Sequence, residues 1–215
     1  KYGLAVIEDN AESLGATYKG QLTGTFGDCS TFSFYGNKII TTGEGGALIF
    51  KDSDMADRAK ILASHGMSPQ RRYYHEEVGF NYRMTNMQAA IGCAQMERID
   101  EILEKREMIR RSYDANLNCG SPTIFSKDGE MTTVNWLYSI FVNDPAVLEK
   151  RLREFNIDSR RMFTPLHRLP YVGSNELFQN AEFLFNKGLS LPTYIDLDEG
   201  DILRVCDIVN AYESS

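Results

Sequence analysis

The apolar run Leu4-Ala5-Val6-Ile7 is the feature that most constrains the fold of this chain. A strand whose residues are all apolar is typical of a parallel sheet, because such a sheet is covered on both faces and its strands do not alternate. Glu8-Asp9-Asn10 follow directly, at the carboxyl end of the predicted strand, where open α/β sheets bind their ligands. The sequence therefore predicts an α/β fold with Asp9 at a functional edge.

The predicted strand starts only four residues into the chain. A domain seldom begins on a core strand, so we expect that part of the fold precedes this sequence and supplies strands beside residues 4–7. Without those neighbours, the strand would expose unpaired edges and apolar surface. We therefore expect the 215-residue segment alone to aggregate or to bind its ligand weakly.

Charge and cysteine usage narrow the classes of partner. The net charge of -7 and the pI near 5.1 disfavour nucleic acid, because a phosphate-backbone binder needs a basic face. No apolar run reaches the length of a membrane span. The cysteines have no Cys-x-x-Cys pair and no histidine at metal-ligand spacing, so we expect reduced thiols of a cytoplasmic protein and no metal site. The four cysteines are Cys29, Cys93, Cys119 and Cys206.

Short elements are predicted in the first part of the chain. Strands over 30–34 and 47–50 flank a turn at Gly36-Asn37-Lys38, and a polar, glycine-punctuated stretch precedes them. A helix is expected over 55–64. The turn thus places Lys38 on the connection between two strands.

A long loop and a long helix follow. Residues 67–83 form a loop rich in Arg and Tyr, and loops of this length are usually functional or cover a partner subunit. Asn86 is expected to cap a helix whose apolar positions recur at three and four as far as Tyr113, with room for one kink.

After Pro122 the pattern changes to that of a small α+β lobe. The expected elements are a strand over 134–142, a helix over 145–155, a strand-like segment over 159–163, and helices over 175–186 and 199–212. The predicted domains are therefore residues 1–105 and 106–215.

Lys38 lies in the segment Ser33-Phe34-Tyr35-Gly36-Asn37-Lys38-Ile39-Ile40-Thr41-Thr42-Gly43-Glu44-Gly45-Gly46. A lysine beside apolar residues on a tight turn, with small residues that let a ligand approach the backbone, suits the formation of a Schiff base. Partial burial there favours a neutral, nucleophilic amine. Spacing alone explains Lys38 equally well as a surface lysine on a hairpin.

Three segments in the same order and spacing resemble one family. They are Ser33 to Gly46, Val6-Ile7-Glu8-Asp9-Asn10-Ala11-Glu12-Ser13-Leu14-Gly15-Ala16, and Gly79-Phe80-Asn81-Tyr82-Arg83-Met84-Thr85-Asn86. The chain is identified by them as a member of the nucleotide-sugar aminotransferases, the DegT/StrS-like branch of the fold-type-I pyridoxal 5'-phosphate (PLP) enzymes, and especially resembles perosamine-synthase-like members. The resemblance implies the fold of PLP-dependent transferases of type I, with the N-terminal part of the large domain missing and a small C-terminal α+β domain.

The resemblance also implies a set of cofactor-binding residues. Lys38 would hold PLP covalently, and Asp9 would keep the pyridine nitrogen protonated while the ring takes up electrons, although Asp9 as a helix cap is the alternative. Ser33 would bind the phosphate, and Asn81 would reach the phosphate of the neighbouring subunit's cofactor, which implies a homodimer with shared active sites. Where the family usually has Gln or His, this chain has Glu12, whose ionised carboxylate would repel the phenolic oxygen of the ring. Glu12 would then be protonated, turned away, a sign of altered function, or simply a solvated residue.

Three further residues are candidates for substrate binding. His167 lies in the Pro-bearing segment 163–167, which in similar enzymes faces the sugar-nucleotide, although a lone histidine is more often structural. Arg71 and Arg72 suit a nucleotide diphosphate, because guanidinium groups pair bidentately with phosphate. A solvated charged loop explains these arginines equally well.

The resemblance implies transfer of an amino group from an amino acid, with glutamate the expected donor, to a nucleotide-linked 4-keto-6-deoxyhexose. Lys38 would hold the cofactor and, once displaced, act as the base that moves the proton from the donor. A PLP-dependent sugar dehydratase is one alternative, but relatives with that activity replace the lysine by His. A truncated, cofactor-binding partner without catalysis is the other, supported only by Glu12 and the abrupt start.

Overall fold

The computed structural model describes residues 2–119, 129–173 and 176–214. The chain forms two compact units. The first comprises Lys1–Leu103 and Ser126–Val134, and the second Glu104–Phe125 and Asn135–Ser215.

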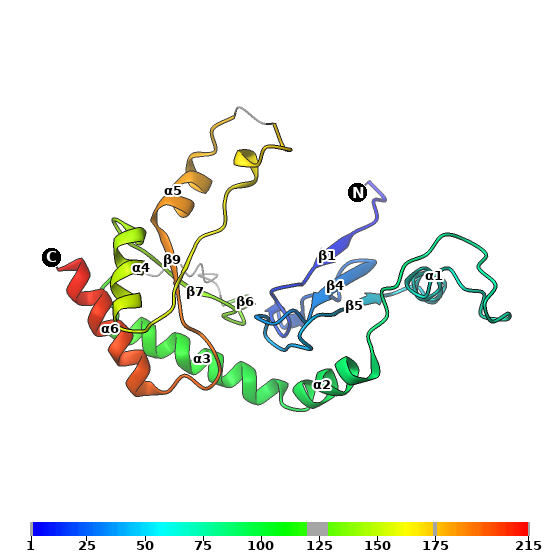
Figure 1. The fold of residues 1–215 in the computed structure, drawn as a ribbon, viewed down its shortest axis with the longest axis horizontal. Helices are drawn as coiled ribbons and strands as arrows, with labels where there is room; N and C mark the ends of the chain where they lie inside the picture. The colour runs from blue at the N-terminus through cyan, green and yellow to red at the C-terminus, as the bar shows by residue number, and fades with distance from the viewer. Residues whose placement is uncertain (1, 120–128, 174–175, 215) are drawn as a thin grey trace. The chain divides into compact units, whose positions relative to one another are not determined.

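A three-stranded sheet forms the centre of the first unit (Figure 1). Strand β1 (Ile7–Asp9) pairs in parallel with β4 (Cys29–Ser33), and β4 pairs antiparallel with β5 (Gly46–Phe50). Asp9 lies opposite Thr31 in this register. The predicted strands over 30–34 and 47–50 are therefore confirmed, each displaced by one residue at its start.

The strand predicted over residues 4–7 has other bounds in the structure, and its burial beside strands that precede this sequence stays a prediction. Strand β1 begins only at Ile7, and the side chains of Leu4 and Ile7 are 75% and 71% exposed. The reason is that, within the described residues, β1 pairs with β4 along one edge only and no element covers residues 4–7.

A second small sheet in the first unit was not predicted. Strands β2 (Thr17–Tyr18) and β3 (Gln21–Leu22) form a hairpin whose two turn residues, Lys19 and Gly20, have φ values of 52° and 76°. Strand β6 (Met131–Thr132) joins them by pairing with β2. Two turn residues with positive φ give the twist that suits a tight hairpin.

Three helices follow the sheet in sequence. They are α1 (Ser53–Ala63), α2 (Asn86–Met96) and α3 (Ile99–Asn116). The predicted kink is confirmed, since Glu97-Arg98 separates α2 from α3. The prediction of Asn86 as the cap is wrong: the hydroxyl of Thr85 caps α2, and Thr85 and Gln88 form a capping box. Threonine followed three residues later by glutamine is the sequence pattern of that box.

The second unit is a three-stranded antiparallel sheet packed against helices. Its strands are β7 (Tyr138–Phe141), β9 (Gly188–Leu191) and β8 (Arg160–Arg161), in that order. Its helices are the continuation of α3, α4 (Pro145–Glu154), the single turn η1 (Leu166–Arg168), α5 (Gln179–Lys187) and α6 (Glu199–Glu213).

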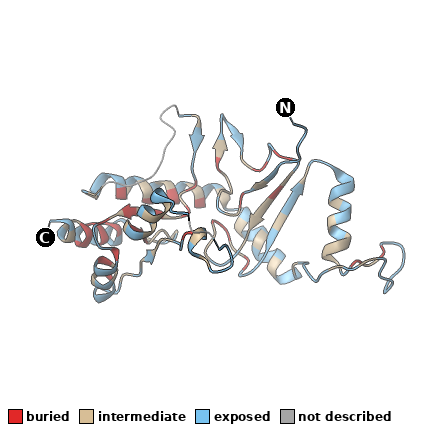
Figure 2. Cartoon of the chain, turned by 90° about the horizontal axis from the view of Figure 1, so that it is seen from above, coloured by how far each residue is buried: buried red, intermediate tan, exposed pale blue. Residues whose placement is uncertain are grey.

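The core of the second unit is built from α3, the sheet, α4 and α6. Figure 2 shows buried residues gathered near the C-terminus. The largest fully buried side chains of this core are Tyr113, Tyr138, Ile140, Leu148, Leu152, Leu189 and Val209. All four residues of β9 are buried, as expected for a central strand.

Some predicted bounds in this lobe need correction. The strand expected over 134–142 is shortened to β7, because Asn135 has a φ of 49°, which no strand residue adopts. Helix α5 begins at Gln179, and residue 175 and Pro122 lie outside the described residues. No helix in the described ranges is both long and apolar enough to cross a membrane.

Candidate active site

Asp9, Thr31 and Ser33 share one face of the central sheet. Thr31 lies opposite Asp9 on the neighbouring strand and donates a hydrogen bond from Oγ1 to Asp9 Oδ1 over 3.2 Å. Ser33 lies two residues further along β4 and therefore faces the same way. Asp9 Oδ1 also accepts a hydrogen bond from the amide of Ala11, so Oδ1 has two donors. Within the described residues, Asp9 Oδ2 accepts none.

The turn after β1 fixes the backbone near Glu12. The amide of Asn10 donates to the carbonyl oxygen of Thr31, and the amide of Ser13 donates to the carbonyl oxygen of Asn10. The Ser13 hydroxyl donates to Asn10 Oδ1 over 2.9 Å. Asn10 is only 3% exposed, so this turn is anchored in the sheet, and Glu12 projects from a defined position.

Lys38 lies on an equally well-defined turn. Its amide donates to the carbonyl oxygen of Tyr35 over 3.0 Å, and the following Ile39 and Ile40 are 4% and 1% exposed. The buried isoleucines anchor the backbone, so that the long Lys38 side chain is the part that can move. That side chain is only 13% exposed.

Lys38 and Glu12 form an ion pair. The distance between Lys38 Nζ and Glu12 Oε1 is 2.9 Å, and the Glu12 side chain is 53% exposed. The Glu12 carboxylate therefore points toward the Lys38 amine, and this half-exposed side chain has an ion-pair partner. Residues 26 apart in sequence meet here because β1 and β4 are neighbouring strands.

The loop after Lys38 needs its glycines. Gly45 has a φ of 148°, and a Cβ there would lie 2.6 Å from Thr42 Oγ1. A Cβ on Gly46 would lie 2.6 Å from the carbonyl oxygen of Phe32. A side chain at Gly45 would therefore displace Thr42 in the loop, and one at Gly46 would push the start of β5 away from β4.

Helix α2 holds this loop through one face. Gln88 donates from Nε2 to the carbonyl oxygen of Glu44 over 3.0 Å, and Gln95 accepts from the amide of Thr41 over 3.4 Å. Gly92 lies between them on the same face, where a Cβ would be 3.1 Å from the Thr42 side chain. Helix α2 therefore holds the loop after Lys38 in place.

Glu8 is an important residue that the sequence analysis did not identify. Its carboxylate accepts hydrogen bonds from the amides of Gly24, Phe26 and Gly27 at 2.7, 2.7 and 2.5 Å. These bonds, that of Gly27 first, lower the pKa of Glu8 below its usual value. Glu8 points to the sheet face opposite Asp9, so it fixes the loop over 24–27 and holds β1 in place. The alternation of faces along a strand was the signal that could have separated these two carboxylates.

The candidate phosphate-binding arginines lie on an ordered loop. The guanidinium of Arg71 lies 4.6 Å from the ring centroid of Tyr74, and that of Arg72 lies 4.8 Å from the ring centroid of Tyr73. Isolated antiparallel β-bridges pair Ser64 with Asn81 and Met67 with His75, so the two arms of the loop are joined at two positions. Asn81 is exposed, and among the described residues its side chain makes no hydrogen bond.

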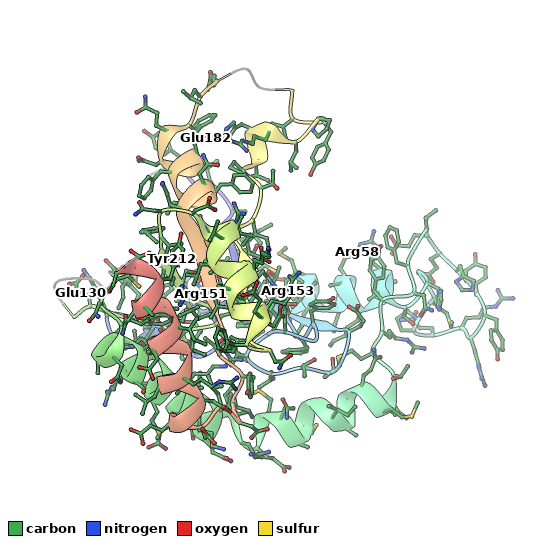
Figure 3. The ribbon with its side chains drawn as sticks, turned by 60° about the vertical axis from the view of Figure 1, so that its left-hand side comes forward. Arg58, Glu130, Arg151, Arg153, Glu182 and Tyr212 are labelled. Carbon is green, nitrogen blue, oxygen red and sulfur yellow. The ribbon has the colours of Figure 1, made fainter. Side chains whose placement is uncertain are left out.

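His167 lies in the second unit and is bound to α5. The distance between His167 Nε2 and Glu182 Oε1 is 2.8 Å, and the ring lies 5.0 Å from that of Phe178. Arg168 Nε also donates to Glu182 Oε1 over 2.7 Å. Figure 3 shows Glu182 on α5, pointing toward the turn η1. With its ring 11% exposed, His167 connects η1 to α5.

Comparison with known proteins identifies the family of the chain. The model of the DegT/DnrJ/EryC1/StrS aminotransferase family matches residues 1–210. The chain belongs to this family.

Among its relatives, GDP-perosamine synthase of Caulobacter vibrioides is 43% identical over 215 residues, which cover 95% of this chain and 58% of that protein. EpsN of Bacillus subtilis, which carries the name of a pyridoxal phosphate-dependent aminotransferase, is 38% identical over 97% of this chain and 56% of its own length. The crystal structure of S. venezuelae DesV superposes with a TM-score of 0.88 at 28% identity, covering 100% of this chain and 59% of that one. The chain thus spans somewhat more than half the length of these relatives.

Proposed function

We propose that the protein containing this chain is a PLP-dependent aminotransferase that acts on a nucleotide-linked keto sugar. The observation that carries this proposal is the position of Lys38 on the turn after β4, with Asp9 and Ser33 on the adjoining sheet face. The family and the relative named GDP-perosamine synthase support the same reaction class. The nucleotide-linked 4-keto-6-deoxyhexose and the amino donor, glutamate, are part of the proposal.

The residues present fit PLP by their chemistry. The cofactor needs an amine for its aldehyde, a carboxylate for its ring nitrogen and donors for its phosphate. Lys38 supplies a largely buried amine, and Asp9 supplies Oδ2, which accepts no hydrogen bond within the described residues. In the described ranges, the hydroxyl of Ser33 accepts only a long bond of 3.4 Å from the amide of Tyr35, so its own proton is available to an anion.

Each residue then has a defined task. When bound, PLP withdraws electrons from the donor's α-carbon, so that the proton on this carbon becomes acidic. Lys38 holds the cofactor through Nζ and, once the donor's amine displaces it, takes that proton. Asp9 Oδ2 holds a proton at the ring nitrogen, and Thr31 orients Asp9 through its hydroxyl. Ser33 binds the phosphate.

Further parts of the proposal concern the assembly and the substrate. We assign Asn81 to the cofactor phosphate of a partner subunit in a cytoplasmic homodimer, supported by its exposed side-chain amide, which forms no hydrogen bond with any described residue. Arg71 and Arg72 are assigned to the nucleotide diphosphate, for which their tyrosine partners hold the guanidinium planes in place. His167 of the small lobe is assigned to binding of the sugar-nucleotide.

Substitution of the lysine tests the proposal. Lys38→Ala in the full protein should abolish the visible absorbance of bound PLP and lower transamination by several orders of magnitude, because covalent binding and proton transfer need the same amine. Lys60→Ala, which removes an exposed lysine of α1, is the matched control and should leave both unchanged. An unchanged spectrum in Lys38→Ala would refute the role of Lys38.

A further inference from the structure

The ion pair between Glu12 and Lys38 joins two positions whose backbones are fixed independently. Glu12 lies in the turn that Asn10 anchors to β4, and Lys38 precedes two buried isoleucines. The side chain of Lys38, with four rotatable methylenes, is the mobile part between them. A carboxylate that holds its end at 2.9 Å therefore selects one of many possible positions for Nζ.

We propose that Glu12 is a positioning residue that binds the Lys38 amine whenever Nζ has no covalent bond to the cofactor. This inference rests on the proposed function, because a lysine of that kind leaves and re-forms its bond in every turnover. It gives Glu12 a role that the resemblance does not imply, because its carboxylate binds the amine of Lys38.

The surroundings of the pair make this effect specific to Lys38. The Lys38 side chain is 13% exposed, so water competes weakly for its amine, whereas the similar ion pair of Lys60 and Asp57 has side chains that are 77% and 69% exposed. The amine must leave Glu12 before Nζ can bond to a carbonyl carbon. Removing the carboxylate should therefore make Nζ more reactive, and only at this lysine.

The test measures acetylation of individual lysines in the cofactor-free full protein. Acetic anhydride is uncharged, so its local concentration does not depend on Glu12, and mass spectrometry of peptides gives the ratio of the Lys38 rate to the Lys60 rate. Glu12→Gln should raise this ratio about two- to fivefold, the range that corresponds to a partly exposed ion pair. Glu12→Asp keeps the charge on a shorter side chain, so its ratio should lie between those of wild type and Glu12→Gln.

Two controls keep the result interpretable. Asp57→Asn removes the exposed pair and should leave the Lys38 rate unchanged. If Glu12→Gln unfolds, all lysines react faster together, and Glu12→Asp then decides the question. An equal Lys38 to Lys60 ratio in wild type and in the folded Glu12 variants would overturn the inference.

A separate measurement distinguishes failure of the proposed function from failure of the inference about Glu12. Wild-type protein is mixed with PLP and reduced with borohydride, and the modified lysine is identified by mass. Absence of PLP on Lys38 overturns the proposed function, whereas PLP on Lys38 together with an unchanged acetylation ratio overturns only the role of Glu12.

Discussion

At the scale of single residues, two adjacent carboxylates in β1 have opposite tasks. Glu8 is bound by three backbone amides and holds a loop, whereas Asp9 keeps one oxygen without a hydrogen bond among the described residues. Successive side chains of a strand point to opposite faces, so neighbours in sequence face different surroundings. Thr31 connects Asp9 to β4 by its hydroxyl, and this bond fixes the carboxylate relative to Ser33.

Asp9→Asn isolates the charge of Asp9 from its geometry. The amide keeps the oxygen that accepts from Thr31 and Ala11, so the fold and PLP binding should be retained. A neutral amide cannot hold a proton on the ring nitrogen, and we expect the proton-transfer step to slow on the order of a hundredfold or more. Single-turnover absorbance changes on addition of glutamate measure this step. A rate within a few-fold of wild type would make Asp9 structural only.

At the scale of elements, a ladder of charges along α3 connects it to the second unit's sheet. Arg110 donates to both oxygens of Glu107 at 2.8 and 2.6 Å, and it also pairs with Asp114. Tyr138 in β7 donates to Asp114 over 2.8 Å, and Asn135 donates to Glu107 over 3.1 Å. The long helix is therefore attached to β7 and to the turn that precedes it.

Glu107 should make the stability of the second unit depend on pH in the acid range. The hydrogen bond from Arg110 is the main cause that lowers the pKa of Glu107 from 4.5 to about 2. Because the folded pKa is the lower one, the stabilisation is fully present above pH 4.5 and is lost as the pH falls toward 2. Glu107→Gln should therefore cost about 1 kcal/mol near neutral pH, after allowance for solvent screening, and progressively less in acid.

Thermal unfolding of Glu107→Gln and wild type at several pH values measures this effect. Glu104→Gln, on the same helix, is the control, because Glu104 is exposed and forms no ion pair within the described residues. A difference between wild type and Glu107→Gln that stays constant from neutral pH to pH 2.5, about half a unit above the folded pKa, would contradict the prediction.

The elements that could be predicted from the sequence are those that depend on local sequence patterns. The lysine turn was predictable because glycines and buried isoleucines surround Lys38, and the helices because their apolar residues recur at helical spacing. Strand β9 was missed because it follows α5 without a turn, and its four residues become a strand only by pairing with β7 and β8. The Glu12 ion pair was missed for the same reason, since it depends on strand pairing and not on sequence distance.

At the scale of the whole molecule, the two units differ in how they are stabilised. The hydrophobic core cluster lies in the second unit around β9, and large apolar side chains are exposed on both units. In the first unit these include Val78 at 86%, Tyr82 at 75% and Met87 at 76%. Side chains of this kind need a covering surface, which the rest of the protein or a partner subunit would supply.

Asn81 provides the test of the shared active site. The backbone of Asn81 bridges to Ser64, and its neighbours Phe80 and Tyr82 stack with ring centroids 5.0 Å apart. Replacement of the side chain leaves these contacts intact, so Asn81→Ala should fold and dimerise like wild type. It should nevertheless lose PLP more readily, because one hydrogen bond to the phosphate is removed; a charge-assisted bond of this kind contributes about 1.5–3 kcal/mol.

Sedimentation velocity with detection at the PLP absorbance measures both properties in one experiment. We expect Asn81→Ala to sediment as a dimer with reduced PLP, and Asn81→Asp to retain still less, because a carboxylate repels the phosphate. Asn180→Ala, which changes an exposed asparagine on α5, should behave as wild type. Dilution separates the two explanations for a loss of PLP: if the phosphate contact comes from the partner, wild-type protein should release PLP as the dimer dissociates. A wild-type monomer that keeps its PLP would show that the site is complete within one subunit.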